Sequence, residues 1–180
     1  GQPVNACIQC AGIATARKMI SAKSPVHAPE DFEKTLQINT VGPFNVARLA
    51  VERMQANDLA ADGQRGCLIH TASIAAYEGQ VGQVAYAASK GAIVGMTLPM
   101  ARDLADKGIR VCTIAPGLFL TPLLDELPQE VQASLGAQVP FPSRLGDPAE
   151  YAAMVSHITQ NSMLNGETIR LDGAIRMAPR

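Results

Sequence analysis

Short apolar runs that alternate with helix-like segments constrain the fold of this chain more than any other feature. The runs at 4–8, 67–71 and 109–115 have the length and composition of buried strands. Segments with the apolar spacing of helices lie between them, at about 29–57 and 86–107. Parallel strands need long, usually helical connections. The alternation therefore predicts a doubly wound α/β fold, with helices on both faces of a mostly parallel sheet.

The last third of the chain fits the same scheme. Asp147-Pro148 is a favourable helix start, because Asp caps free amide groups and Pro suits the first turn. Residues 166–171 are expected to form a final short strand. The segment 118–138 carries two prolines among short helical patterns. We expect it to be a mobile lid over a substrate rather than a part of the sheet.

Length and charge limit the classes of partner. A chain of 180 residues that is 47% hydrophobic suits one globular domain. The formal net charge is −1, and there is no basic run interleaved with aromatic residues, so we expect no nucleic-acid partner. No apolar stretch approaches 18 residues, so we expect no membrane span. These features predict a cytoplasmic protein, or one of the mitochondrial matrix in a eukaryote.

The cysteines do not form a convincing metal or redox motif. Cys67 and Cys112 lie in apolar runs and are expected to be buried core residues. Cys7 and Cys10 have C-x-x-C spacing, but they end a strand-like run, whereas a redox pair is expected at a helix N-terminus. No second cysteine pair or close histidine pair completes a zinc site. We therefore predict no metal centre.

Tyr86 and Lys90 stand four residues apart in the second helical segment. On a helix both side chains project from one face, about one turn apart. A neighbouring ammonium favours the phenolate and lowers the pKa of the phenol, which suits Tyr86 for proton exchange with a substrate. Ser73, after the strand at 67–71, could hold a substrate oxygen at the carboxyl end of the sheet, where ligands bind. From spacing alone, an exposed surface pair is an equally good interpretation.

Asn39 and Gly42 lie within the first helical segment. Both residue types are unfavourable in the interior of a helix. A local kink and a functional asparagine remain equally good explanations at this point.

Together these residues resemble the short-chain dehydrogenase/reductase family. Its Tyr-x-x-x-Lys is matched by Tyr86 and Lys90, and its serine thirteen positions earlier by Ser73. The family's Asn-x-x-Gly within a long helix is matched by Asn39 and Gly42. The matches stand in the family's order and spacing, and the resemblance covers the whole chain.

Two further motifs extend the resemblance. The family's Pro-Gly-x-x-x-Thr is matched by Pro116, Gly117 and Thr121. Its Asn-Asn-Ala-Gly appears as Gln-Cys-Ala-Gly at 9–12, which departs at the first two positions. Longer runs, such as Gly-Gln-Val-Gly-Gln and Ile-Arg-Leu-Asp-Gly-Ala-Ile-Arg-Met, resemble one group of the family, the type-II 3-hydroxyacyl-CoA dehydrogenases, which include hydroxysteroid-oxidising members.

The resemblance implies a Rossmann-like fold and NAD-linked oxidation of a 3-hydroxyacyl-CoA, or a hydroxysteroid, to the ketone. Tyr86 would take the hydroxyl proton, and Lys90 would lower the Tyr86 pKa and hold the nicotinamide ribose. Ser73 would bind the substrate oxygen, and Asn39 would anchor a water that links Lys90 to solvent. Gln83 and the 118–138 lid would shape the acyl pocket, and a homotetramer is implied. The residues implied in cofactor binding are Cys10, Ala11, Gly12, Tyr86, Lys90, Pro116, Gly117, Phe119 and Thr121.

One departure from the family is large. Its cofactor-binding start, a strand, a Gly-rich turn and a helix, has no counterpart before Cys10. We therefore expect residues 1–180 to be the C-terminal part of a single Rossmann domain, lacking about three strands. Such a fragment would expose a sheet edge, bind dinucleotide poorly and be inactive alone.

Three alternative functions stay open. An NADPH-dependent 3-oxoacyl carrier-protein reductase would use the same catalytic residues. A cofactor-free binding module is possible because the cofactor-binding start has no counterpart here. A serine hydrolase is the least favoured, because the sequence has no G-x-S-x-G.

Overall fold

A parallel sheet forms the centre of the protein. The computed structural model describes residues 2–22 and 25–179, apart from the side chain of Leu123. The four strands of the sheet lie in the order β1-β2-β3-β4, and every neighbouring pair is parallel. They are β1 (Ala6–Gln9), β2 (Gly66–Thr71), β3 (Ile109–Pro116) and β4 (Thr168–Leu171). The predicted α/β class and parallel sheet are confirmed.

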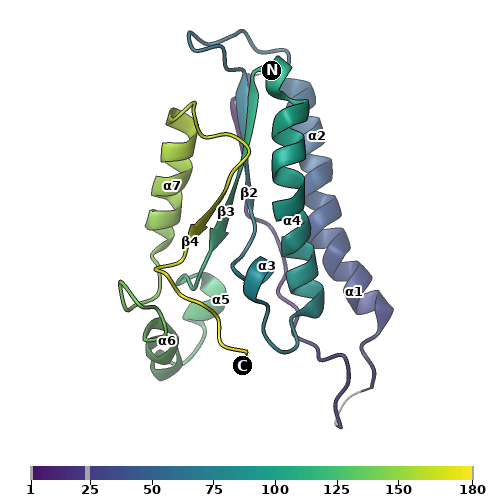
Figure 1. Ribbon diagram of the computed structural model, residues 1–180, viewed down its shortest axis with the longest axis vertical. Helices are drawn as coiled ribbons and strands as arrows, with labels where there is room; N and C mark the ends of the chain where they lie inside the picture. The colour runs from purple at the N-terminus through teal and green to yellow at the C-terminus, as the bar shows by residue number, and fades with distance from the viewer. Residues whose placement is uncertain (1, 23–24, 180) are drawn as a thin grey trace.

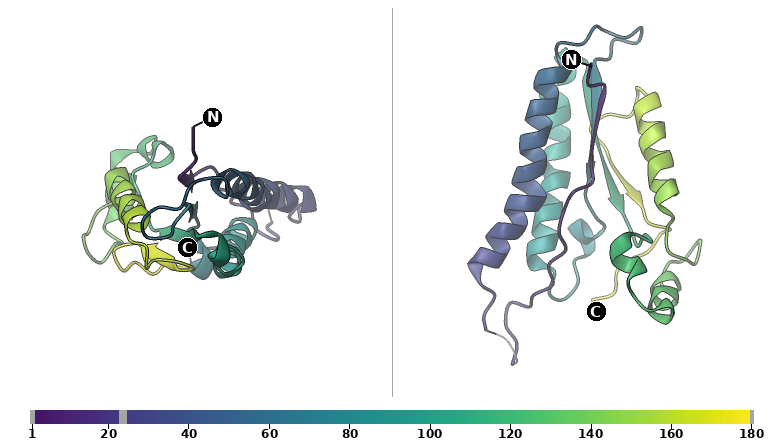
Figure 2. Two further views of the ribbon diagram at one scale, coloured as in Figure 1. Left: turned by 90° about the horizontal axis from the view of Figure 1, so that it is seen from above. Right: turned by 180° about the vertical axis from the view of Figure 1, so that it is seen from behind.

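Helices cover both faces of this sheet, as Figures 1 and 2 show. One face carries α2 (Gly42–Met54) and α4 (Val84–Asp103), with α1 (Pro29–Leu36) leading into α2, and the other face carries α7 (Pro148–Gln160). The shorter elements are α3 (Ala75–Glu78), a 3₁₀ turn at Ala105–Lys107, α5 (Pro122–Asp125) and α6 (Gln129–Gly136). The 118–138 segment thus holds two short helices outside the sheet.

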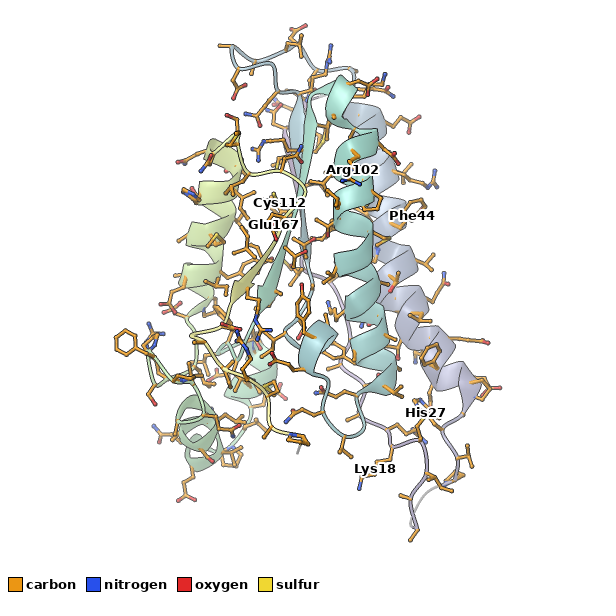
Figure 3. The ribbon with its side chains drawn as sticks, in the orientation of Figure 1. Lys18, His27, Phe44, Arg102, Cys112 and Glu167 are labelled. Atoms are coloured by element: carbon orange, nitrogen blue, oxygen red, sulfur yellow. The ribbon has the colours of Figure 1, made fainter. Side chains whose placement is uncertain are left out.

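Alternate residues of the central strands supply the two cores. Leu68 of β2 and Val111 of β3 are fully buried against α2 and α4. Ile69 and Cys112, one position further along each strand, are fully buried on the opposite face toward α7 (Figure 3). Side chains of successive strand residues point to opposite faces, so both faces of these strands must be apolar. This explains why the strands read as continuous apolar runs.

The predicted helix at 29–57 is interrupted. A π-helical turn, Gln37–Val41, separates α1 from α2. Pro43 lacks an amide hydrogen, so it cannot bond to the carbonyl of Asn39 four residues earlier, and the regular ladder breaks there. Likewise, α4 ends at Asp103 rather than near Lys107, and Gly108 closes the following 3₁₀ turn with a φ of 68°.

The capping of α7 is as predicted. The Asp147 side chain accepts a hydrogen bond from the Ala149 amide, and Glu150 bonds back to the Asp147 amide. This reciprocal arrangement satisfies two amides that the first turn leaves free.

Cys7 and Cys10 do not act as a pair. Cys7 packs into the core beneath α2 and α4, whereas the thiol of Cys10 lies 3.7 Å from the Thr71 hydroxyl. Cys67 and Cys112 are buried, as predicted. Within the described residues, no group of three or more histidine, cysteine, aspartate or glutamate side chains is placed to hold a metal ion.

β1 forms one edge of the sheet. Within residues 2–22 and 25–179 it pairs only with β2, and Ile8 is 42% exposed. None of the described helices combines the length and the hydropathy needed to cross a membrane.

Candidate active site

The carboxyl ends of three strands gather most of the predicted site residues. Cys10 follows β1 directly, Thr71 ends β2 two residues before Ser73, and Pro116 ends β3. Parallel strands place these ends on a single edge of the sheet. α4 packs on the same face of the sheet as α2 and carries Tyr86 and Lys90 in its first two turns (Figure 1).

Ser73 and Tyr86 meet at this edge. The Ser73 hydroxyl lies close enough to the Tyr86 phenol to interact with it and to favour its ionised form. Ser73 also accepts a 3.1 Å hydrogen bond from the Ala75 amide, at the start of the one-turn helix α3. This bond fixes the serine side chain toward the phenol. The structure therefore brings together two residues that lie thirteen positions apart in the sequence.

Lys90 joins the same group from the next turn of α4. It is only 6% exposed, and its Nζ donates a 2.9 Å hydrogen bond to the Thr71 carbonyl oxygen. The ammonium lies 5.8 Å from the centre of the Tyr86 ring, which places it over the face of the ring. Burial lowers the pKa of Lys90 to about 8. The interpretation of Tyr86 and Lys90 as an exposed surface pair is therefore wrong.

The expected direction of the Tyr86 pKa is also wrong. Burial raises the pKa of Tyr86 above its usual value, and the interaction with Ser73 offsets only part of that rise. Desolvation is the dominant cause of the shift. The Lys90 ammonium, meanwhile, bonds to the Thr71 carbonyl and lies over the ring rather than at the phenol oxygen.

Asn39 is buried at the π-helical turn and bonds to the segment after β1. Its side-chain oxygen accepts a 2.8 Å bond from the Ile13 amide, and its nitrogen donates to the Ile13 carbonyl and to the Ser89 hydroxyl. Asn39 is 1% exposed. The helix is distorted at Asn39, and the asparagine fixes the chain beside Lys90. Its expected role in water binding stays a prediction.

Gly12 lies between Asn39 and Lys90. A β-carbon at this position would lie 3.1 Å from the Asn39 side-chain oxygen and 3.5 Å from the Lys90 nitrogen. The missing side chain lets the backbone after β1 pack closely against Asn39 and the buried Lys90 ammonium.

The remaining predicted residues lie around this centre. The Phe119 ring packs edge-on against Tyr151, with ring centres 6.5 Å apart. Gly117 packs against Asp172, and Thr121 is the exposed residue that precedes α5. Gln83 precedes α4, and its side-chain oxygen accepts a bond from the Gln80 amide. The structure does not link Thr121 or Gln83 directly to the Tyr86 phenol.

Sequence reasoning missed Thr71 and Tyr151. Thr71 accepts the Lys90 bond through its carbonyl, and its hydroxyl forms a 2.5 Å hydrogen bond with the Tyr151 phenol. Burial raises the pKa of Tyr151, so its phenol is a neutral hydrogen-bonding group. Thr71 could have been predicted from the sequence, because it lies at the carboxyl end of a predicted strand, where ligands bind. Tyr151, which reaches the site from α7, had no such signal.

Comparison with known proteins assigns a family. The family model described as short chain dehydrogenase matches residues 2–132. A 3-hydroxyacyl-CoA dehydrogenase type-2 from Bos taurus is 62% identical over 177 residues, covering 98% of this chain and 68% of that protein. The chain thus spans about two thirds of that relative's length.

Solved structures show the same fold. A 3-hydroxyacyl-CoA dehydrogenase type-2 from Mycobacterium avium superposes with a TM-score of 0.93 at 41% identity, over 98% of this chain and 69% of the other. A 7α-hydroxysteroid dehydrogenase, complexed with NADH and 7-oxo glycochenodeoxycholic acid, superposes with a TM-score of 0.81 at 25% identity. That match covers 99% of this chain and 66% of the other.

Proposed function

The chain belongs to the short-chain dehydrogenase family, and we propose that it oxidises the secondary alcohol of a 3-hydroxyacyl-CoA to the ketone with NAD. The observation that carries this proposal is the meeting of Ser73, Tyr86 and Lys90 at the carboxyl edge of the sheet. The 62% identity to a 3-hydroxyacyl-CoA dehydrogenase supports the substrate class.

The residues at the strand ends fit a nicotinamide nucleotide. Gly12 brings the backbone close to the Lys90 ammonium, which can donate hydrogen bonds to ribose hydroxyls. The backbone at Cys10 and Ala11, the Pro116-Gly117 turn, Phe119 and Thr121 would complete the cofactor site. When bound, the nicotinamide supplies the acceptor for the hydride that leaves the alcohol carbon. A 7α-hydroxysteroid dehydrogenase of the same fold was solved with NADH, which supports NAD over NADP.

The side chains of this chain handle the proton. The Ser73 hydroxyl and the Tyr86 phenol, which lie close to each other, would both contact the substrate oxygen. As the alcohol becomes a ketone, its hydroxyl proton passes to the oxygen of ionised Tyr86, so oxidation uses the phenolate form. Because burial raises the pKa of Tyr86, the phenol is protonated at neutral pH, and oxidation should speed up as the pH rises. In the reverse direction, protonated Tyr86 is ready to donate.

Replacing Tyr86 by Phe in the full-length protein tests this assignment. The change removes the proton acceptor and keeps the ring, so turnover should fall by about 10²–10⁴-fold while cofactor binding persists. Tyr77→Phe is the matched control, because Tyr77 is exposed and contacts Arg170 through its ring. Steady-state rates measure turnover, and a fluorescence titration with NADH measures cofactor binding. Retained turnover in Tyr86→Phe would contradict the assignment.

Steady-state rates with different substrates and cofactors test the substrate preference and the cofactor preference. We expect 3-hydroxybutyryl-CoA with NAD to give the highest kcat/KM, above NADP and above a hydroxysteroid. A preference for NADPH with an acyl carrier-protein substrate would favour the reductase alternative. Gln83 and the 118–138 lid would shape the acyl pocket, so variants of Gln83 should change chain-length preference.

Assembly and compartment follow from the family and from exposed groups. Several apolar residues of α2 and of the π-helical turn before it are 38–49% exposed, and Phe44 lies on the outer side of α2 (Figure 3). Such a continuous apolar surface suits burial between subunits, so we propose a homotetramer, to be tested by light scattering.

The four cysteines are free, which favours a reducing compartment, the cytoplasm or the mitochondrial matrix.

A further inference from the structure

The segment that joins Ser73 to Tyr86 is held by contacts from outside it, and Glu78 makes several of them. The first half of this segment is α3, and the second half is the loop 79–83. α3 is a single turn, too short to be stable by its own hydrogen bonds. Contacts from outside the segment must therefore hold it in place.

Glu78 receives three hydrogen bonds from elsewhere in the fold. Arg170 of β4 contacts both of its carboxylate oxygens, at 2.8 and 3.3 Å. The Met177 amide donates a 3.0 Å bond to Oε2. The two side chains are only 22% and 24% exposed, so this bidentate pair is partly shielded from solvent. One carboxylate thus links α3 to β4 and to the segment that follows β4.

The C-terminal segment also bonds to the loop before α4. The side-chain nitrogen of Gln80 donates to the Ala178 carbonyl at 2.9 Å, and the Val81 amide donates to the Pro179 carbonyl at 3.0 Å. Figure 1 shows this segment leaving β4 and passing below α3. The Gln80 amide in turn bonds to the side chain of Gln83, three residues before Tyr86. The loop is therefore held along its length.

Arg170 is itself fixed from several sides. Its Nε donates a 2.7 Å bond to Asp172, and its Nη2 donates a 3.1 Å bond to the Ile175 carbonyl. The guanidinium lies 5.5 Å from the centre of the Tyr77 ring. Arg176 makes a longer ion pair with Glu78, at 3.4 Å. An arginine held by this many contacts gives Glu78 a rigid anchor rather than a flexible surface partner.

We propose that Glu78 is a positioning residue, which uses Arg170 and the segment 172–179 to set the loop 79–83 against the acyl substrate. The proposal rests on the proposed function, because the substrate is the one assigned above. Glu78 does not contact the reacting atoms. Its effect is expected in substrate binding rather than in the proton transfer itself.

Glu78→Gln tests this proposal with Glu52→Gln, an exposed glutamate of α2, as the matched control. Gln keeps the length of the side chain and can still accept the Met177 bond, but it loses the charge paired with Arg170. We expect the KM for 3-hydroxybutyryl-CoA to rise about tenfold and the KM for NAD to stay within about twofold. Hydrogen exchange of the Val81 and Met177 amides should become faster. Glu52→Gln should change none of these.

A merely structural role gives a different result. A fall in apparent kcat with both KM values unchanged, matched by the folded fraction, would overturn the proposal. Unchanged exchange at Val81 would also overturn it. If Glu78→Gln fails to fold, Gln80→Ala removes only the side-chain bond to Ala178, and a selective rise in the acyl KM is still expected. If the full-length protein, with the cofactor-binding start in place, turns over no 3-hydroxyacyl-CoA, the proposed function fails, while exchange at Val81 still decides whether Glu78 holds the loop.

Discussion

Lys90 and Thr71 are joined across the carboxyl edge of the sheet, where the Lys90 ammonium donates a 2.9 Å hydrogen bond to the Thr71 carbonyl. This bond ties α4 to the end of β2. Ser73 follows Thr71 by two residues and Tyr86 precedes Lys90 by one turn, so the bond also sets the distance between serine and phenol. A buried cation is thereby held beside the groups that handle the proton.

Replacing Lys90 by Met removes that cation and keeps an unbranched side chain of similar length. We expect turnover to fall by about 100-fold or more, because the ammonium no longer supports charge at the Tyr86 phenol. The KM for NAD should rise as well, because the ribose loses a donor. Lys107→Met, at an exposed lysine paired with Asp106, should leave the rate unchanged. Steady-state kinetics check both variants, and an unaltered Lys90→Met rate would contradict this role.

Replacing Asn39 by Ala should lower the free energy of unfolding by about 1–3 kcal/mol, because it leaves the partly buried amide and carbonyl of Ile13 without their partners. Urea unfolding measures this change. Asn45→Ala is the control, since Asn45 is exposed and bonds to Arg48 on the helix surface. Its effect should stay within about 0.5 kcal/mol. Equal effects of the two changes would show that the Ile13 bonds contribute little.

Adding a methyl group at Gly12 should crowd Asn39 and Lys90, which lie 3.1 and 3.5 Å from the new carbon. Asn39 is held by Ile13 and has little room to yield, so Gly12→Ala should weaken NAD binding and turnover by about tenfold or more. Gly95→Ala is the contrasting change. Nothing lies within 4 Å of its new carbon, and Gly95 is an exposed residue inside α4. It should raise the free energy of unfolding by about 0.5–1 kcal/mol. Calorimetry and a cofactor titration compare the two variants.

His70 should make the protein less stable in mild acid. It is 1% exposed, and its Nδ1 bonds to the Gln9 side-chain oxygen. The Gln9 nitrogen donates to the Pro43 carbonyl, so the Gln9 oxygen is the acceptor and Nδ1 carries the proton. Nε2 is left as the buried site that must take up a second proton. Burial lowers the pKa of His70 to about 4, from 6.5 in an unfolded chain.

The direction in which stability changes with pH follows from proton uptake by the unfolded chain. Below pH 6.5 the unfolded chain binds a proton at His70 and the folded chain does not, so stability falls between pH 6.5 and about 4, by about 3 kcal/mol. Urea unfolding of the unmodified protein and of His70→Asn at several pH values isolates this contribution. Asn can still donate to Gln9 but cannot titrate. The same pH slope in both proteins would show that other groups cause the acid sensitivity.

Local sequence determined the elements and the family. The apolar runs around Leu68 and Val111 and the Asp147 cap each act over a few residues, so their outcomes could be read directly. Family motifs with fixed spacing likewise identified Ser73, Tyr86 and Lys90.

Tertiary structure decided the properties that depend on packing between distant segments. The direction of the Tyr86 pKa is set by desolvation, which exists only once α4 covers the strand ends, and it reversed the expectation from spacing. The bond from Tyr151 to Thr71 and the contact of Arg170 with Glu78 join residues 80 and 92 positions apart. No local pattern encodes such pairs, because the fold alone brings the two partners within reach of each other.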